Sequence, residues 1–278
     1  MKISLDWIHD YVKVDLPLPE LLDRLTMIGL VAESVEETGG DTILDVETYA
    51  NRPDTLGHLG IAREIAAMLG VPLTEPCWPL TESGPPMSQL ADVQVLDDGL
   101  CPRYCARVVR GLTVGPSSEW LRKRVEAMGL RPINNVVDAS NYVLFATGQP
   151  IHAFDFGKLP GGKVVVRRAG RGERLLDLEG RTLELGPDML VIADESRPVA
   201  LAGVIGGEET GIGGSTRDVF IESATFDPVS IRLTAKKLGL ATDASYRFER
   251  GADIDFAPKG ALMMASLLTR LGGQADAR

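Results

Sequence analysis

Residues 131–155 read RPINNVVDASNYVLFATGQPIHAFD and combine an apolar helical run with an unusual density of polar side chains. The run from Val136 to Leu144 predicts a helix that ends at the turn Gly148-Gln149-Pro150, and His152 follows this turn. The polar members of the stretch are Asn134, Asn135, Asp138, Ser140 and Asn141. Because buried amides and carboxylates need hydrogen-bonding partners, their density here indicates a ligand site.

Two further stretches share this mixed character, residues 220–228 (FIESATFDP) and 242–251 (TDASYRFERG). We expect all three to line one small-molecule pocket. Alternation along the first of the two places Phe220, Glu222 and Ala224 on one face of a strand. If that face is buried, Glu222 is an inward acid that needs a donor; on an edge strand it would lie in water.

The composition is that of an ordinary globular chain, with 44% hydrophobic and 24% charged residues among 278. This length accommodates two domains. No apolar run approaches the roughly 20 residues that span a bilayer, and acidic residues at Asp6 and Asp10 argue against a signal peptide. We therefore expect a cytoplasmic protein without membrane contact.

The formal net charge of −10 disfavours binding to nucleic acid through the surface as a whole. An RNA partner would have to meet a local basic group, although each group taken alone is most simply a solvated face. The groups are Arg122-Lys123-Arg124, then Arg167, Arg168, Arg171 and Arg174, and finally Arg232, Lys236 and Lys237.

Motifs for metals, cofactors and covalent catalysis are missing. Cys77, Cys101 and Cys105 form no CxxC pair and have no histidine near them that would complete a zinc site. The glycines between 203 and 214 fit neither GxxxxGK[ST] nor a GxGxxG between a strand and a helix. No HExxH motif or local signature of a catalytic triad occurs. We expect no metal and no cofactor.

Periodicity predicts a small α+β domain at residues 1–73. Helices are expected at 4–12, 20–30 and 55–69, and strands at 31–37 and 43–49 form an antiparallel pair around a turn at 38–41. Residues 74–90 contain four prolines and little periodicity, so they are expected to be a linker.

Residues 91–278 are expected to form a larger, mixed-sheet α+β domain, because many short strands alternate with few helices. The sequence from Leu175 to Leu185 predicts a hairpin that turns at Glu179-Gly180. Strands are expected at 93–96, 104–110, 163–168, 189–193, 199–204 and 219–223, and helices at 118–128, 134–146, 229–238 and 256–271.

For His152 and Gly203 the sequence leaves more than one role open. His152 is expected at the mouth of a loop, where it acts as a general base, positions a water or simply makes a local hydrogen bond. Gly203 either forms a tight turn or lets the backbone approach a ligand closely. His9 and His58 are expected on helix surfaces.

The long motifs around these residues resemble the bacterial phenylalanyl-tRNA synthetase β subunit over almost the whole chain. The motifs are YANRPDTLGHLGIAREIAAMLG, RPINNVVDASNYVLFATGQPIHAFD, ALAGVIGGEETGI and IESATFDPVSIRLTAKKLGLATDASYRFERG. The resemblance implies a small N-terminal α+β domain and an editing domain over residues 91–271. In that family the editing domain hydrolyses tyrosine mistakenly esterified to the phenylalanine tRNA.

Position by position, the resemblance implies an editing pocket made of Ser140, Asn141, His152, Gly203, Glu222, Thr242 and Ala244. Glu222 would accept the phenolic O–H of tyrosine, which phenylalanine lacks. His152, Asn141 and Thr242 would place the ester and its attacking water. The family usually has threonine at the position of Ser140, and serine keeps the hydroxyl.

The chain also departs from the family. An oligonucleotide-binding insert of roughly a hundred residues normally separates the parts that match residues 31–37 and 43–49. The catalytic-like core and the anticodon-binding domain are not matched, so we expect no aminoacylation by this chain alone. Three functions remain open: a free-standing editing hydrolase, a shortened β subunit active only with a synthetase subunit, or a non-catalytic module for tyrosine or a similar aromatic amino acid. The tRNA partner would be met at its 3′ aminoacyl end.

Overall fold

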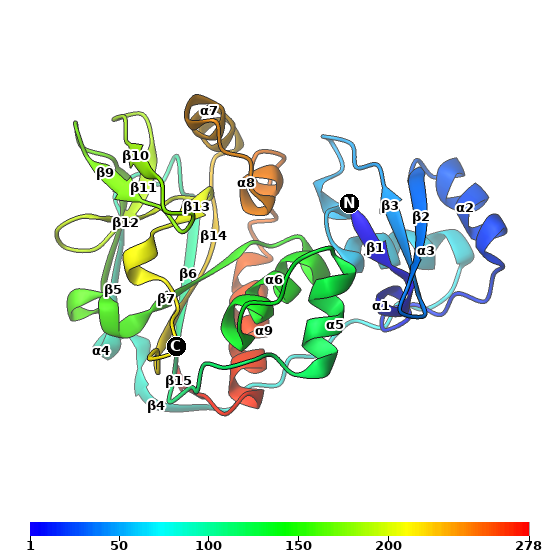
Figure 1. The fold of residues 1–278 in the computed structure, drawn as a ribbon, viewed down its shortest axis with the longest axis horizontal. Coiled ribbons are helices and arrows are strands. Elements are labelled where there is room, and N and C mark those ends of the chain that lie inside the picture. The colour runs from blue at the N-terminus through cyan, green and yellow to red at the C-terminus, as the bar shows by residue number, and fades with distance from the viewer. Residues whose placement is uncertain (278) are drawn as a thin grey trace.

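The computed structural model describes residues 1–277, and two α+β units lie side by side in it (Figure 1). The N-terminal unit contains a three-stranded antiparallel sheet in the order β1-β3-β2. Its elements are β1 (Lys2–Ser4), α1 (Leu5–Ile8), α2 (Leu18–Met27), β2 (Ala32–Thr38), β3 (Asp41–Val46), the 3₁₀ turn η1 (Pro53–Thr55) and α3 (His58–Leu69). The expected antiparallel pair is confirmed, and Gly39 and Gly40 turn it with positive φ.

The larger unit has two five-stranded sheets, in the orders β13-β12-β11-β8-β5 and β4-β15-β6-β14-β7. The pairs β5–β8 and β4–β15 are parallel and the other described pairs antiparallel, so the expected mixed α+β class is confirmed. The strands are β4 (Glu82–Pro86), β5 (Asp92–Val95), β6 (Arg103–Arg110), β7 (Ile151–Asp155), β8 (Lys163–Arg168), β9 (Arg174–Leu176), β10 (Thr182–Glu184), β11 (Leu190–Ala193), β12 (Pro198–Leu201), β13 (Ile205–Gly206), β14 (Val219–Thr225) and β15 (Gln274–Ala277).

Helices α5, α6 and α9 lie between the N-terminal unit and the five-stranded sheet that contains β6 and β14 (Figure 1). Helix α9 packs on β6 and β14, and α6 packs on both α9 and α3, so one apolar core runs through both units. A second core fills the space between the two large sheets. The helices of this unit are α4 (Met87–Leu90), α5 (Glu119–Ala127), α6 (Asn135–Thr147), α7 (Pro228–Leu238), α8 (Asp243–Phe248) and α9 (Ala257–Arg270).

Helix α6 follows the pattern read from the sequence. Asn134 is its N-cap, and the side-chain oxygen accepts hydrogen bonds from the backbone N–H groups of Val136 and Val137. Gly148 ends the helix with φ of 79°. The remaining predicted helices and strands also form, with ends shifted by a few residues, and β9 and β10 make the expected hairpin.

Three local expectations are wrong, and one short helix was missed. His152 lies within β7 rather than at the mouth of a loop. His58 is fully buried at the start of α3 instead of on a helix surface, because its two ring nitrogens bond to distant backbone groups. Residues 82–90 of the expected linker form β4 and α4. Helix α8 was not predicted, because six residues show no apolar period.

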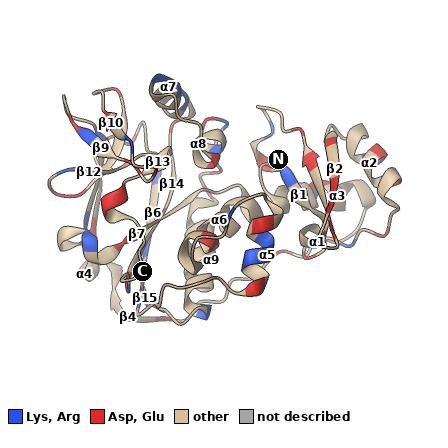
Figure 2. Ribbon diagram, viewed as in Figure 1, with Lys and Arg blue, Asp and Glu red and all other residues tan. Residues whose placement is uncertain are grey.

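The basic groups are largely paired with acids, and both charge signs are interspersed over both units (Figure 2). On α5, Lys123 pairs with Glu119. On β8, Arg167 pairs with Glu173 at 2.7 Å. Other pairs are Arg122–Glu126, Arg124–Asp10, Arg168–Asp97, Arg174–Glu184 and Lys237–Asp188. Within residues 1–277 no helix has the length and apolarity to cross a bilayer.

Candidate functional site

Glu222 lies in the middle of β14, a strand whose seven residues are all buried. Strands β6 and β7 flank β14 on either side, and Glu222 lies opposite Ala106 on one neighbour and His152 on the other. The side chain is 7% exposed. Of the two alternatives read from the sequence, the inward acid is therefore correct and the solvated edge strand is wrong.

The Glu222 carboxylate receives a hydrogen bond from the hydroxyl of Tyr104, at 2.8 Å from Oε2. Burial raises the pKa of Glu222 to about 7, and the bond from Tyr104 opposes this shift. No other hydrogen bond to this carboxylate occurs among the described residues. Glu222 therefore changes between its neutral and charged forms near neutral pH and keeps capacity for a further partner.

Tyr104 was not identified as a site residue from the sequence. It lies on β6 opposite Ala224, two residues from the partner of Glu222. Alternation would have placed Tyr104 and Ala106 on one face, but only the pairing register shows that this face meets Glu222. The buried acid raises the pKa of the Tyr104 hydroxyl further above its ordinary value, after burial itself. The phenol is thus a neutral donor.

His152 is held on the same face of the sheet as Glu222, because directly opposed residues of an antiparallel pair point to the same side. Its ring packs edge-on against Phe154 at a centroid distance of 4.3 Å. Nε2 is buried and has no hydrogen-bonding partner among the described residues. Burial lowers the pKa of His152 to about 4, so the imidazole is neutral at pH 7.

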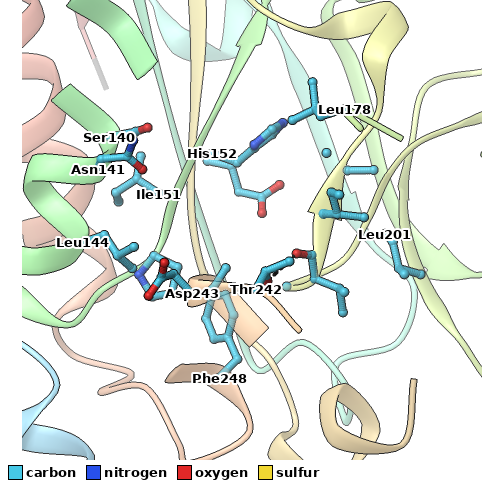
Figure 3. A pocket seen from close by; sticks show the side chains of 18 of the residues that line it. Ser140, Asn141, Leu144, Ile151, His152, Leu178, Leu201, Thr242, Asp243 and Phe248 are labelled. Atoms are coloured by element: carbon cyan, nitrogen blue, oxygen red, sulfur yellow. Dashed lines mark hydrogen bonds between the residues drawn. The ribbon is translucent and has the colours of Figure 1, made fainter. Parts of the chain in front are cut away.

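One cavity of about 300 Å³ lies between α6, β7, β14, the β12–β13 connection and α8 (Figure 3). This volume is at the lower end of the range of about 300–1,000 Å³ for small-molecule sites. Seven of the lining residues are those named from the sequence: Ser140, Asn141, His152, Gly203, Glu222, Thr242 and Ala244. The structure therefore brings together residues that span more than a hundred positions of the chain.

The cavity also has walls that sequence reasoning missed. Leu178 from the β9–β10 hairpin and Leu201 from β12 lie across from α6 (Figure 3). Phe248 and Asp243 of α8 belong to the stretch 242–251, which was expected to line the pocket. Apolar residues carry no chemical signature in a sequence, so nothing marked these leucines as site residues.

Helix α6 contributes Ser140 and Asn141 to the cavity. The Ser140 hydroxyl donates to the backbone carbonyl of Val137 at 2.7 Å. Its proton is therefore engaged within the helix, and its lone pairs remain for a ligand. Asn141 is half-buried and offers both a carbonyl and an amide group.

Thr242 has a structural task at the N-terminus of α8. Its hydroxyl accepts a hydrogen bond from the Ser245 N–H and donates one to the Val204 carbonyl at 2.8 Å. Ser245 returns the bond by accepting from the Thr242 N–H, which completes a capping box. The Thr242 hydroxyl thus ties the N-terminus of α8 to the β12–β13 connection.

Gly203 forms a tight turn, with φ of 67°. A Cβ at this position would lie 2.7 Å from Cδ1 of Ile231 and 2.8 Å from Cδ2 of Phe226. The requirement for glycine thus comes from the turn and from packing against core side chains, as the simpler of the two sequence interpretations held. Gly203 lines the cavity as well.

Gly206 contacts the ring of His152 directly. A Cβ here would lie 2.3 Å from Cε1 of the imidazole and 2.7 Å from its Nε2. The missing side chain at Gly206 therefore makes room for the ring. Among the described residues no group of three His, Cys, Asp or Glu side chains is arranged to hold a metal ion.

The B3/4 domain profile matches residues 100–273, more than half of the chain. The chain belongs to the B3/4 domain family. All seven residues named above lie within the matched region.

Relatives that align beyond this region are phenylalanine–tRNA ligase β subunits. That of Moorella thermoacetica is 47% identical over 243 residues, which are 87% of this chain and 30% of the relative. That of Rhodopirellula baltica is 42% identical over 276 residues, 98% of this chain and 40% of the relative. The resemblance read from the motifs is therefore confirmed. The chain spans well under half the length of these curated relatives.

A solved structure also aligns with the chain, an N-terminal fragment of the phenylalanyl-tRNA synthetase β subunit from Pyrococcus horikoshii. The TM-score is 0.47 at 16% identity, and the alignment covers 99% of this chain and 75% of the fragment.

Proposed function

We propose that this chain is an aminoacyl-tRNA editing hydrolase that removes tyrosine from mischarged phenylalanine tRNA. The observation that carries the proposal is the opposition of Glu222 and His152 inside one cavity. The Glu222 carboxyl group can hydrogen-bond the phenol of the substrate, and the neutral His152 imidazole can accept a hydrogen bond from a water near the ester. Membership of the B3/4 domain family and the similarity to synthetase β subunits support the choice of substrate.

Specificity for tyrosine follows from the cost of covering Glu222 without giving its carboxyl group a hydrogen-bonding partner beside Tyr104. Whether ionised or protonated, the carboxyl group can form a hydrogen bond with the phenolic hydroxyl of tyrosine. Phenylalanine would cover the same buried acid with an apolar ring edge. Sites that hydrogen-bond a substrate hydroxyl reject the analogue lacking it by roughly 10⁴-fold or more.

Hydrolysis requires a water to attack the ester carbonyl carbon. The tetrahedral intermediate then collapses with cleavage of the bond to the terminal ribose oxygen, which takes up a proton, and tyrosine leaves as a carboxylate. Neutral His152 would accept the proton of the attacking water or hold that water in place. The amide of Asn141 would hydrogen-bond the ester group, while Thr242 fixes the adjoining wall.

The test is deacylation of Tyr-tRNA and Phe-tRNA, both carrying the phenylalanine acceptor, by the purified chain. We expect selective release of tyrosine, lost in Glu222→Ala and His152→Ala. Matched controls are Glu184→Ala, an exposed acid on β10, and His9→Ala, an exposed histidine. Equal hydrolysis of both substrates, or full activity of Glu222→Ala, would overturn the proposal. Activity only after addition of synthetase subunits would show that the chain edits as part of an assembly.

A second candidate is a non-catalytic module that binds tyrosine or a similar aromatic amino acid. The observation that favours it is the engagement of both cavity hydroxyls, since Ser140 and Thr242 donate to backbone carbonyls. The net charge of −10 adds to this, because it opposes contact with tRNA. Tyrosine binding by calorimetry without any deacylation would select this function.

A further inference from the structure

Helix α8 forms one wall of the cavity and is only six residues long. Thr242, Asp243, Ala244 and Phe248 all line the cavity from this segment. A helix this short is not stable by itself, because nucleation costs more than so few hydrogen bonds return. The position of this wall therefore depends on the contacts that hold α8 from outside.

The first anchor of α8 is at its N-terminus. The Thr242 hydroxyl donates to the Val204 carbonyl, so the cap is tied to the β12–β13 connection. Val204 itself lines the cavity. This contact joins two walls of the same cavity. Elsewhere on the helix, Phe248 packs edge-on against Phe226, and the Tyr246 hydroxyl shares a hydrogen bond of 3.3 Å with the Thr48 hydroxyl of the N-terminal unit.

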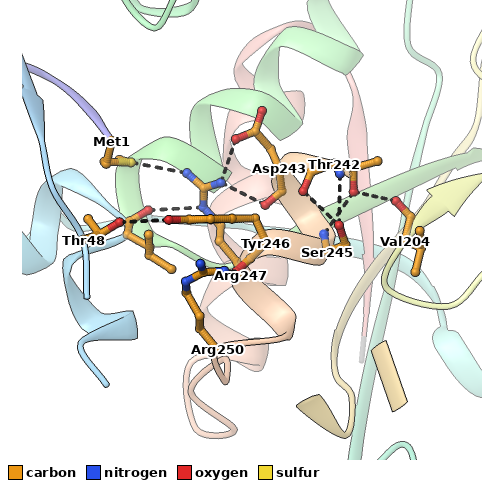
Figure 4. A network of polar contacts seen from close by, with 10 residues as sticks. Met1, Thr48, Val204, Thr242, Asp243, Ser245, Tyr246, Arg247 and Arg250 are labelled. Carbon is orange, nitrogen blue, oxygen red and sulfur yellow. Dashed lines mark hydrogen bonds and ion pairs between the residues drawn. The ribbon is translucent and has the colours of Figure 1, made fainter. Parts of the chain in front are cut away.

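The second anchor is Arg247, whose guanidinium reaches the N-terminal unit (Figure 4). Nε donates to the carbonyl of Leu56 at 3.2 Å, and Nη2 lies 3.5 Å from Sδ of Met1. Nη1 donates back to the carbonyl and the carboxylate of Asp243, at 2.9 Å each. The guanidinium also lies over the ring of Phe145, 4.9 Å from its centroid.

The Leu56 carbonyl, which accepts the hydrogen bond from Arg247, is itself held in place. Leu56 is 1% exposed and precedes Gly57, whose backbone presses against the end of α6. A Cβ at Gly57 would lie 2.4 Å from the backbone nitrogen of Gly148. The Leu56 carbonyl therefore does not move independently of α6, which forms another wall of the cavity.

We infer that Arg247 is a positioning residue, which holds the α8 wall of the cavity against the N-terminal unit. The inference rests on the proposed function of the cavity. An arginine that is 2% exposed is expensive to bury unless its donors are used. Here the guanidinium donates to Asp243, which lines the cavity, and to the Leu56 carbonyl of the N-terminal unit. The N-terminal unit thereby takes part in substrate binding without touching the substrate.

Arg124 provides a matched control, because it also reaches from the larger unit to the N-terminal unit. It donates to Asp10 at 2.8 Å and lies over the ring of Trp7. Its helix, α5, contributes no residue to the cavity. Loss of either arginine weakens the contact between the units, but of the two only Arg247 belongs to α8 and ties it to the N-terminal unit.

The experiment compares Arg247→Met, Arg247→Lys and Arg124→Met at a temperature where circular dichroism shows all three folded. We expect Arg247→Met to raise the KM for Tyr-tRNA and the Kd for tyrosine about tenfold, with a smaller change in kcat. Arg247→Lys should lie between, since one ammonium cannot reproduce the planar fork. Arg124→Met should change KM and Kd less than twofold. Equal effects of the two methionine variants would overturn the inference.

Hydrogen exchange separates this inference from the proposed function. The backbone amides of residues 243–248 should exchange faster in Arg247→Met than in the parent chain. In Arg124→Met their exchange rates should equal those of the parent chain. Unaltered exchange there in Arg247→Met overturns the inference whether or not the chain hydrolyses Tyr-tRNA. If the parent chain neither binds tyrosine nor releases it, the proposed function fails, while faster exchange would still support the anchoring of α8.

Discussion

Glu222 and His152 lie directly opposite one another on the antiparallel strands β14 and β7, with both side chains facing the same cavity. Burial moves their pKa values in opposite directions, up to about 7 for the acid and down to about 4 for the imidazole. Both shifts favour the neutral form of each group. At neutral pH the cavity therefore holds an uncharged base beside an acid poised between its two forms.

The raised pKa of Glu222 predicts a pH-dependent cost to folding. In the unfolded chain the acid ionises near pH 4.5, whereas in the folded chain it stays protonated up to about pH 7. The folded state is thus favoured by this group at low pH, and the advantage is lost as the pH rises through 7. Glu222→Gln should gain about 3 kcal/mol relative to the parent between pH 4.5 and pH 8. Urea unfolding at several pH values measures this, and a constant difference would contradict it.

His152 should titrate near pH 4 in the folded chain, well below an ordinary imidazole. Its proton resonances, assigned by comparison with His152→Gln, give this value directly by NMR. Because a lowered pKa favours the neutral form, the stability from this group is complete above pH 6.5 and lost as the pH falls through 4. Deacylation should therefore show no histidine inflection between pH 5 and 8. An inflection near pH 6.5 that survives in Glu222→Gln would contradict this.

Much of the fold could be predicted from the sequence, because periodicity and turn residues act locally. The antiparallel pair around Gly39-Gly40 and the capped helix α6 follow from such signals. Strand β7 was not predicted, since it follows a proline and its pairing with β14 joins residues far apart in the sequence. The partners of His58, the N–H of Ser4 and the carbonyl of Phe145, lie 54 and 87 residues away in the sequence.

The candidate site could likewise be predicted in part, while features that depend on distant strand pairing could not. Resemblance to a family named seven residues, and the fold places all of them around one cavity. The sequence could not supply Tyr104, which reaches Glu222 only because of the β6–β14 register. Nor could it show that the hydroxyl of Thr242 is engaged with Val204. Register and hydrogen-bond direction are properties of the assembled chain.

Gly206→Ala should abolish tyrosine release while the chain stays folded. The new methyl group would collide with Cε1 of His152 and push the imidazole out of place. Gly213→Ala is the control, because a Cβ there meets nothing within 4 Å and its φ is not positive. Deacylation rates and circular dichroism of both variants test this. Normal activity of Gly206→Ala would show that the position of the ring does not matter for hydrolysis.

His58 and His9 should respond very differently to replacement by alanine. His58 is fully buried, its Nε2 accepts from the Ser4 N–H at 3.0 Å, and its Nδ1 donates to the Phe145 carbonyl at 2.8 Å. The ring also stacks on Trp7. Removing it leaves a cavity and two unpaired backbone groups, so His58→Ala should lose about 3 kcal/mol of unfolding free energy.

His9 is exposed at the end of α1, and His9→Ala should change the free energy of unfolding by less than about 0.5 kcal/mol. Urea unfolding of both variants at pH 7 gives the comparison. Burial lowers the pKa of His58 to about 3, so the imidazole is neutral in the folded chain and its contribution is complete above pH 6.5. The loss in His58→Ala should therefore shrink as the pH falls below 6, because folding must keep this ring uncharged. A loss that grows on acidification would mean that the buried ring carries a proton.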